Sequence, residues 1–152
     1  MQPADLLTHP EGGKFREVFR SPMRVMTDDG RARSALTHIY FSLGSGEVSR
    51  FHRVSSDEVW NLYRGDGIRI HTWAGPGASP VCTELSPQAN AFCHVVAAGE
   101  WQAAEPIGDA VLVGCSVGPG FEFEDFEMIN PASADAEAIR ADDPALVRFI
   151  LP

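Results

Sequence analysis

A histidine and a glutamate that stand close together in the chain are the residues best suited to chemistry. They are His52 and Glu58, within the segment GEVSRFHRVSSDEVWNLYRG that runs from Gly46 to Gly65. In water an imidazole titrates near pH ~6.5 and a glutamate carboxyl near pH ~4.3, and burial in an apolar cavity favours the uncharged form of each. Such a pair is suited to proton transfer, and a buried structural ion pair between the two side chains is the alternative.

Strand alternation indicates which side chains share a face with this pair. Successive residues of a strand point to opposite sides, so Glu58 lies on the same face as Trp60 and Leu62. If the two apolar side chains line the interior of the protein, Glu58 lines it too. By the same rule His52 shares its face with Val54.

A second carboxylate interrupts an apolar stripe near the N-terminus. Phe15, Glu17 and Phe19 are expected on one face of a strand. A buried carboxylate is costly unless it is paired or functional. Glu17 therefore either reaches water or pairs with an arginine such as Arg16 or Arg53, or it lines a pocket as an acid or base.

Short alternating segments separated by Gly, Pro, Asp or Ser cover most of the chain. This pattern is typical of an antiparallel barrel or sandwich rather than of alternating strands and helices. So many short strands in one domain indicate a closed or double-layered sheet. The expected strands are Lys14–Arg20, Ser34–Leu43, Val48–Val54, Glu58–Tyr63, Gly67–Trp73, Pro80–Leu85, Ala91–Val96, Trp101–Ala104, Val111–Val117 and Glu122–Met128.

The end of the chain differs from the rest, because its pattern favours short helices. Ser133 is a suitable helix N-cap, and Pro144 can begin a second helical turn. We expect this tail to pack against the outside of the barrel through Ile139, Leu146, Val147 and Ile150.

Composition is that of a soluble globular domain and argues against several partners. The chain has 152 residues, 44% of them hydrophobic and 22% charged, and no apolar run approaches the ~18 residues of a membrane span. A formal charge of −9, from 12 basic and 21 acidic residues, argues against nucleic acid. The N-terminus lacks the basic start and apolar stretch of a secretory signal, so we expect a cytoplasmic protein.

The remaining thiols and imidazoles show no ligand spacing. The cysteines form neither a close pair nor a disulfide framework, and Cys115 lies in an apolar run typical of a buried core position. We expect surface or core positions, without a chemical role, for Cys82, Cys93, Cys115, His9, His38, His71 and His94.

The segment from Gly46 to Gly65 fits the first cupin motif, G-x5-H-x-H-x3-E-x6-G, with Val54 in place of the second histidine. On this motif the chain resembles the cupin superfamily, and within it the small family Cupin_5 (domain of unknown function 985). Similar stretches cover residues 6–21, 39–67, 94–105 and 111–128. The resemblance implies an all-β double-stranded β-helix, the cupin jelly-roll barrel, with short C-terminal helices, as a single domain over residues 1–152. It also places the face of His52 inward, so that this histidine and Glu58 share a cavity.

The second cupin motif, G-x5-P-x-G-x2-H-x3-N, departs from the family pattern as well. Aligning Gly99 with its internal glycine places Ala97 at the proline, Gln102 at the metal-binding histidine and Pro106 at the asparagine. The resemblance therefore implies a depleted ligand set of His52, Val54, Glu58 and Gln102.

This set is poor for a transition metal, which normally takes three or four nitrogen, sulfur or oxygen donors. We expect no cofactor. The alternative is weak binding of a divalent metal through His52, Glu58 and Gln102.

Other side chains near the motifs could bind a substrate in the cavity. Aromatic rings would stack and exclude water, and polar groups would orient the ligand by hydrogen bonds. Each also has a structural interpretation, since a tryptophan on a strand is more often core, and an arginine beside His52 can face solvent or pair with Asp57 or Glu58. The substrate-binding candidates are Gln102, Trp60, Trp101, Tyr63, Phe41, Arg53 and Glu17.

Three functions fit these residues. The first is metal-independent acid/base catalysis by His52 and Glu58, as an epimerase, isomerase or lyase on a small polar carbonyl or sugar-like compound; metal-free epimerases of similar fold are the analogy. The second is a small-molecule binding protein or sensor without catalysis. The third is a metal-dependent cupin with the depleted ligand set.

The expected assembly is a homodimer. Cupins of the resembled type share barrel edges between protomers, and an N-terminal strand that carries Phe15 and Phe19 needs to be covered.

Overall fold

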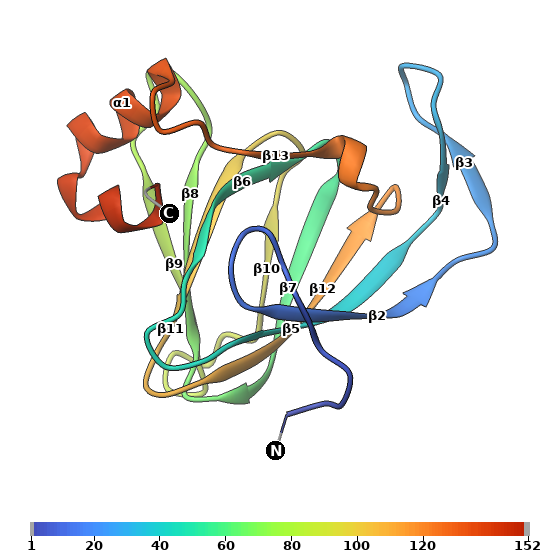
Figure 1. The fold of residues 1–152 in the computed structure, drawn as a ribbon, viewed down its shortest axis with the longest axis horizontal. Helices are drawn as coiled ribbons and strands as arrows, with labels where there is room; N and C mark the ends of the chain where they lie inside the picture. Colours follow the sequence, from blue (N-terminus) through green and yellow to red (C-terminus); the bar gives the residue numbers. More distant parts are fainter. Residues whose placement is uncertain (1, 151–152) are drawn as a thin grey trace.

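Two antiparallel sheets face each other and enclose the main core (Figure 1). The computed structural model describes residues 2–150. One sheet has six strands in the order β1-β2-β5-β12-β7-β10, and the other has five in the order β13-β6-β11-β8-β9. The strands are β1 (Leu7–Thr8), β2 (Lys14–Arg20), β3 (Arg24–Met26), β4 (Ala32–Ser34), β5 (Thr37–Leu43), β6 (Ser49–Val54), β7 (Asp57–Gly65), β8 (Ile68–Trp73), β9 (Val81–Leu85), β10 (Cys93–Val96), β11 (Trp101–Pro106), β12 (Val111–Gly118) and β13 (Phe126–Met128). This architecture confirms the expected all-β fold.

Two expected strands are broken in the structure. The expected strand Ser34–Leu43 divides, because its first residue, Ser34, is the last residue of β4, which pairs with β3 in a separate hairpin, whereas β5 pairs with β2 and β12. The hairpin projects from one side of the molecule (Figure 1). The expected strand Glu122–Met128 contains the short 3₁₀ helix η1 (Phe123–Asp125) before β13. In both cases the expected strand spans a point where the chain passes from one structural element to the next.

The predicted face of the N-terminal strand is wrong for Phe19, because β2 contains a bulge. Glu17 pairs with Ile39 but Phe19 pairs with His38, so the register shifts between them. The extra residue turns the following side chains over. Phe19 is consequently 47% exposed, and it does not share the inward face of Phe15 and Glu17.

The main core lies between the two sheets. Apolar side chains from both meet there, including Phe41 of β5, Trp60 of β7, Ile70 of β8 and Val113 of β12. Their β-branched and aromatic side chains alternate with outward residues, as the period of a strand requires. This packing fixes the inward orientation of the neighbouring positions on β7 and β12.

The C-terminal segment builds a second core against the outer side of the five-stranded sheet (Figure 1). It consists of α1 (Ala134–Asp142) and the 3₁₀ helix η2 (Pro144–Phe149). The Ser133 hydroxyl accepts a hydrogen bond from the Ala136 N–H and caps α1, as predicted. The buried side chains of the segment pack against Phe51, Trp73 and Trp101. Among residues 2–150, no helix has the length and apolar character of a membrane span.

Phe149 does much of this packing, whereas the predicted contact Val147 is only half-buried. The Phe149 side chain is 0% exposed, and its ring contacts Phe51 and His71. Ile139, Leu146 and Ile150 are buried as expected.

Truncating Phe149 should therefore unfold the protein more readily. Phe149→Ala leaves a cavity between the tail and the sheet and should lower the free energy of unfolding by about 3–5 kcal/mol, measured by guanidinium denaturation. Val147→Ala is the matched control in the same helix and should cost about 1 kcal/mol. Equal losses for the two variants would show that the tail does not form the second core described.

Candidate functional site

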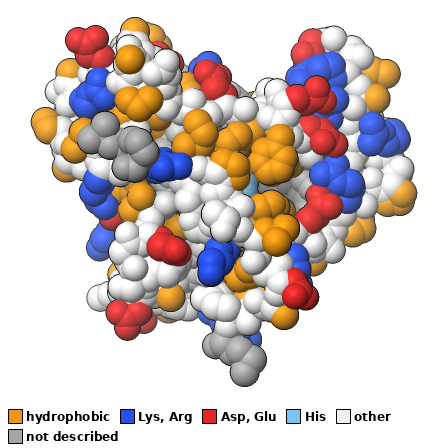
Figure 2. Space-filling model, viewed as in Figure 1, with side chains coloured by type: hydrophobic (Ala, Val, Ile, Leu, Met, Phe, Trp, Pro, Cys, Tyr) orange, Lys and Arg blue, Asp and Glu red, His pale blue; other side chains and the backbone are white. Residues whose placement is uncertain are grey.

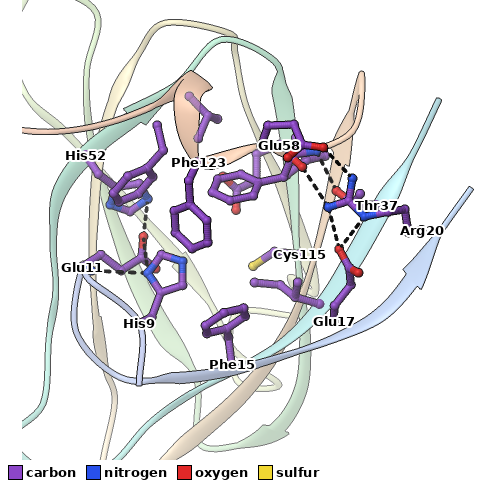
Figure 3. Close-up of a pocket in the computed structure, with 16 residues that line it drawn as sticks. His9, Glu11, Phe15, Glu17, Arg20, Thr37, His52, Glu58, Cys115 and Phe123 are labelled. Atoms are coloured by element: carbon purple, nitrogen blue, oxygen red, sulfur yellow. Dashed lines mark hydrogen bonds and ion pairs between the residues drawn. The ribbon is translucent and has the colours of Figure 1, made fainter. Parts of the chain in front are cut away.

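A pocket of about 100 Å³ opens between the two sheets, at the end where β2, η1 and β13 meet. Figure 2 shows hydrophobic side chains beside a hollow in the middle of this face, in which a histidine is visible. In Figure 3, His9, Glu11 and His52 lie on one side of the pocket, and Glu17 and Arg20 lie on the opposite side. Phe15, Phe123 and Cys115 lie between them. The pocket thus has two charged walls separated by apolar groups.

His52 and Glu11 form a buried ion pair in the first wall. The Nε2 atom of His52 lies 2.7 Å from Oε2 of Glu11, and its Nδ1 donates to the Arg50 carbonyl at 2.7 Å. His52 is 2% exposed, and its ring stacks on Phe126 with centroids 5.4 Å apart. A carboxylate and a carbonyl are both acceptors, so the imidazole is protonated on both nitrogens. His52 is therefore an imidazolium held in a fixed orientation.

The ion pair sets the charge of both partners. Burial alone would lower the pKa of His52, but the Glu11 carboxylate outweighs burial and raises that pKa above its ordinary value. Burial alone would raise the pKa of Glu11, and His52 outweighs it, so the pKa of Glu11 is lowered. Both groups stay charged because each compensates the other.

The loop before β2 brings Glu11 to this position. The backbone N–H of Arg50 donates to the Glu11 carbonyl at 2.7 Å, and the Arg50 guanidinium donates to the Pro10 carbonyl at 2.6 Å. Gly12 has a φ of +114°, and a Cβ atom there would collide with the Val48 carbonyl. Only glycine fits this close approach of the loop to β6. The sequence Pro10-Glu11-Gly12 thereby places a carboxylate against His52.

His9, in the same loop, is a neutral neighbour of this pair. Its Nδ1 accepts a hydrogen bond from the Glu11 backbone N–H at 3.3 Å. Burial lowers the pKa of His9, with Glu11 opposing and His52 adding to the effect. Its ring contacts Phe15 at 4.8 Å and Phe126 at 5.5 Å, so it behaves as part of the aromatic wall.

Glu58 is a buried carboxyl that has no such cationic partner in direct contact. It projects from β7 into the pocket and is 7% exposed. Its Oε1 accepts a hydrogen bond from Nε2 of Gln102 at 2.9 Å, and Oε1 of Gln102 accepts from Nε1 of Trp60 at 2.7 Å. Burial raises the pKa of Glu58 to about 7, with His52 opposing and Glu11 adding to the shift. This carboxyl changes its protonation state near neutral pH.

The mouth of the pocket carries an arginine shared by two carboxylates. Nη2 of Arg20 lies 2.8 Å from Oε1 of Glu17, and its Nη1 lies 3.0 Å from Oε1 of Glu122. The arginine thus ties β2 to the segment that precedes η1. Glu17 pairs with Arg20 on its own strand, and not with Arg16 or Arg53.

The structure brings three of the predicted site residues into the pocket, namely His52, Glu58 and Glu17. Gln102 and Trp60 lie directly behind Glu58 and orient it through the hydrogen bonds above. Phe41 belongs to the main core, with its ring 6.0 Å from that of His9.

Three other predicted substrate-binding residues lie outside the pocket. Arg53 stacks over Trp101 at 4.4 Å and pairs with Glu127, and Nε1 of Trp101 donates to Asp135 in the first turn of α1. The Tyr63 hydroxyl lies 2.8 Å from Nε2 of His38 on the outer face of the six-stranded sheet. Each of the three is next in the chain to an inward-facing residue of its strand, so strand alternation points its side chain away from the pocket.

Glu11, His9 and Arg20 line the pocket but were not predicted as site residues from the sequence. Glu11 and His9 precede the expected strand, and strand alternation does not predict where the side chains of a loop point. The Gly12-Gly13 pair was the available signal, because it marks a tight turn that can return the chain to the barrel. The alternative of an ion pair between His52 and Glu58 is not what the structure has, because His52 pairs with Glu11.

The donors at the motif positions do not match a transition-metal site. Val54 offers no donor, and both nitrogens of His52 and both polar atoms of Gln102 already have protein partners. Within residues 2–150, no group of three or more His, Cys, Asp or Glu side chains could hold a metal ion.

Comparison with known proteins agrees with this fold and its motifs. The model of the family Cupin_5, described as Cupin superfamily (DUF985), matches residues 1–129. No curated protein matches the chain.

Solved structures add two relatives of similar length and one longer protein that shares the fold. A protein from Shewanella oneidensis is 32% identical with a TM-score of 0.79, over 100% of this chain and 99% of that one. A hypothetical protein from Leishmania major is 27% identical with a TM-score of 0.79, over 94% and 91% of the two chains. An oxalate decarboxylase of Bacillus subtilis, 13% identical with a TM-score of 0.61 over 88% of this chain and 33% of that one, is similar in fold alone. The chain therefore belongs to the Cupin_5 family of the cupin superfamily and has its jelly-roll fold.

Proposed function

We propose that the pocket carries out acid/base chemistry without a metal on a small polar carbonyl or sugar-like compound, as an isomerase, epimerase or lyase. In this proposal Glu58 takes and returns the proton. His52 and Glu11 supply a fixed charged wall beside it. The expected cytoplasmic location and homodimeric assembly stay predictions.

The observation that carries the proposal is the position of Glu58. Its carboxyl lines a mostly apolar pocket, is held by the amide of Gln102, and makes no ion pair with any cation among residues 2–150. A general base or acid is most effective when its pKa lies near the working pH. The pKa of Glu58, raised by burial to about 7, meets this condition.

His52 has an electrostatic role in this proposal. Both of its N–H groups have acceptors in the protein, Glu11 and the Arg50 carbonyl, so it is not a free base. Its positive charge opposes the rise that burial causes in the pKa of Glu58. Because Glu11 compensates that charge at 2.7 Å, the pair acts as a fixed dipole whose positive end favours the ionised form of Glu58, the form that takes a proton.

A small-molecule binding protein is the second candidate function. The hydrogen bonds that hold His52 and Gln102 in place favour a rigid ligand site as much as a catalytic one. Turnover separates the two candidates, because a binding protein would leave every bound compound unchanged.

Replacing the Glu58 carboxyl should change how stability depends on pH. The native carboxyl holds its proton up to about pH 7, whereas an ordinary glutamate has a pKa of 4.5. Between these values the native state binds more protons, so Glu58 makes stability fall as pH rises. The free energy of unfolding of Glu58→Gln minus that of wild type should therefore rise by about 3 kcal/mol from about pH 4.5 to pH 7, at ~1.4 kcal/mol per pKa unit.

Guanidinium denaturation across this pH range measures the difference between the two proteins. Glu127→Gln removes an exposed carboxylate of the same type, outside the pocket, and should show no such trend. A wild-type and Glu58→Gln difference that stays constant with pH would mean that Glu58 titrates as an ordinary carboxyl.

Proton exchange tests the reaction itself without knowledge of the product. In D₂O the wild type should exchange the proton next to the carbonyl in one or more members of a panel of small hydroxyaldehydes, hydroxyketones and aminoketones, followed by ¹H NMR. Glu58→Gln should slow this exchange by about a hundredfold or more, because the base is lost. Glu127→Gln should retain the wild-type rate. A Glu58→Gln variant that keeps more than about a tenth of the rate would remove Glu58 from the reaction.

A further inference from the structure

The pocket contains more negative than positive side chains. Around its wall the acidic groups are Glu11, Glu17, Glu58 and Glu122, and the cationic groups are His52 and Arg20. His9 also lines it but is neutral, since burial lowers its pKa. A ligand that carries a negative charge would add to this excess, whereas a cationic ligand would reduce it.

The ion pairs within the protein leave an excess of negative charge at two places, the interior and the mouth of the pocket. Glu11 and His52 compensate each other at 2.7 Å. At the mouth, Glu17 and Glu122 share the single guanidinium of Arg20. In the interior, the polar partners of Glu58 within residues 2–150 are the Gln102 amide and the Cys115 thiol, neither of which is charged. A cation in the pocket would lie near both the interior and the mouth carboxylates.

The apolar part of the wall is aromatic, which also suits a cation. The rings of Phe121, Phe123 and Phe126 stand at steep angles to one another, with centroids 5.0 to 6.1 Å apart. Phe15 closes the opposite side beside His9 (Figure 3). The faces of such rings attract a desolvated ammonium group through their quadrupoles.

We propose that the compound bound in this pocket carries a protonated amine, held between the Glu58 carboxyl and the phenylalanine rings. The inference rests on the proposed function in one respect, that this pocket is the substrate site, and it narrows the substrate class to small amino-carbonyl compounds. The cavity of about 100 Å³ is smaller than the roughly 150 Å³ that accommodates benzene, so the part of the ligand inside it is a short amine.

Three probes of similar size and different charge test this inference. Propylammonium, 1-propanol and propionate are each titrated into ¹⁵N-labelled wild type at about pH 8, and the amide shifts of pocket residues are followed. Propylammonium should bind at least about tenfold more tightly than 1-propanol, and propionate should give no saturable shift. Equal binding of the ammonium and the alcohol, or tighter binding of propionate, would overturn the inference.

Two pocket variants and one control assign the selectivity to its source. Glu58→Gln should weaken propylammonium by about tenfold and leave 1-propanol nearly unchanged. Phe123→Leu keeps an apolar side chain at a half-exposed position and should weaken only the ammonium, by roughly threefold. Glu127→Gln should change none of the affinities. If the variants weaken the alcohol and the ammonium equally, the pocket does not select for charge.

This result is independent of the proton-exchange assay, because none of the three binding probes is an aldehyde or ketone that could undergo the exchange. Exchange that depends on Glu58, together with probes that show no preference for the cation, would overturn the amine inference alone. A preference for the cation without Glu58-dependent exchange would contradict the catalytic proposal and leave the amine site supported.

Discussion

The buried ion pair between His52 and Glu11 is the interaction on which the pocket depends. It connects β6 with the loop before β2 at 2.7 Å, away from water. Loss of one partner would leave an uncompensated charge in the interior, which typically costs about 3–5 kcal/mol. Gly12 makes this contact attainable, because a side chain there would collide with the Val48 carbonyl. The close approach of the loop to β6 therefore forms one side of the pocket and keeps Glu11 and His52 charged there.

Since this pair is internally compensated, Glu58 becomes the titrating group of the pocket. In a cupin that has a full ligand set, the motif positions supply donors to a metal; here Val54 is apolar, and Gln102 is occupied with Trp60 and Glu58. The Gln102 amide, at the position where the motif has a metal-binding histidine, orients the Glu58 carboxyl. Burial then sets the protonation of Glu58, with its pKa raised to about 7. Of the two departures from the cupin motifs, Gln102 is therefore the one that holds the Glu58 carboxyl in place.

The sequence predicted the parts of the site that follow from strand alternation and missed those that depend on loops. His52 and Glu58 line one pocket as expected; the position of Glu58 followed from its phase with Trp60 and Leu62, and that of His52 from the resemblance to the cupin motif. Alternation also explains why Arg53 points away, next to His52. A bulge in β2, which no local pattern signals, reversed the expected face of Phe19. Glu11 was missed because the direction of a loop is set by tertiary contacts, here with Arg50 across the barrel end.

The central claim is that the Glu58 carboxyl carries a proton that it can exchange near neutral pH. Titration of the side-chain carboxyl carbons in ¹³C-glutamate-labelled protein measures this directly, with the Glu58 signal assigned by its absence from Glu58→Gln. The structure predicts a titration with a pKa of about 7, raised by burial. A Glu58 signal that titrates at the ordinary value of 4.5 would contradict the proposed role of this residue and of the pocket built around it.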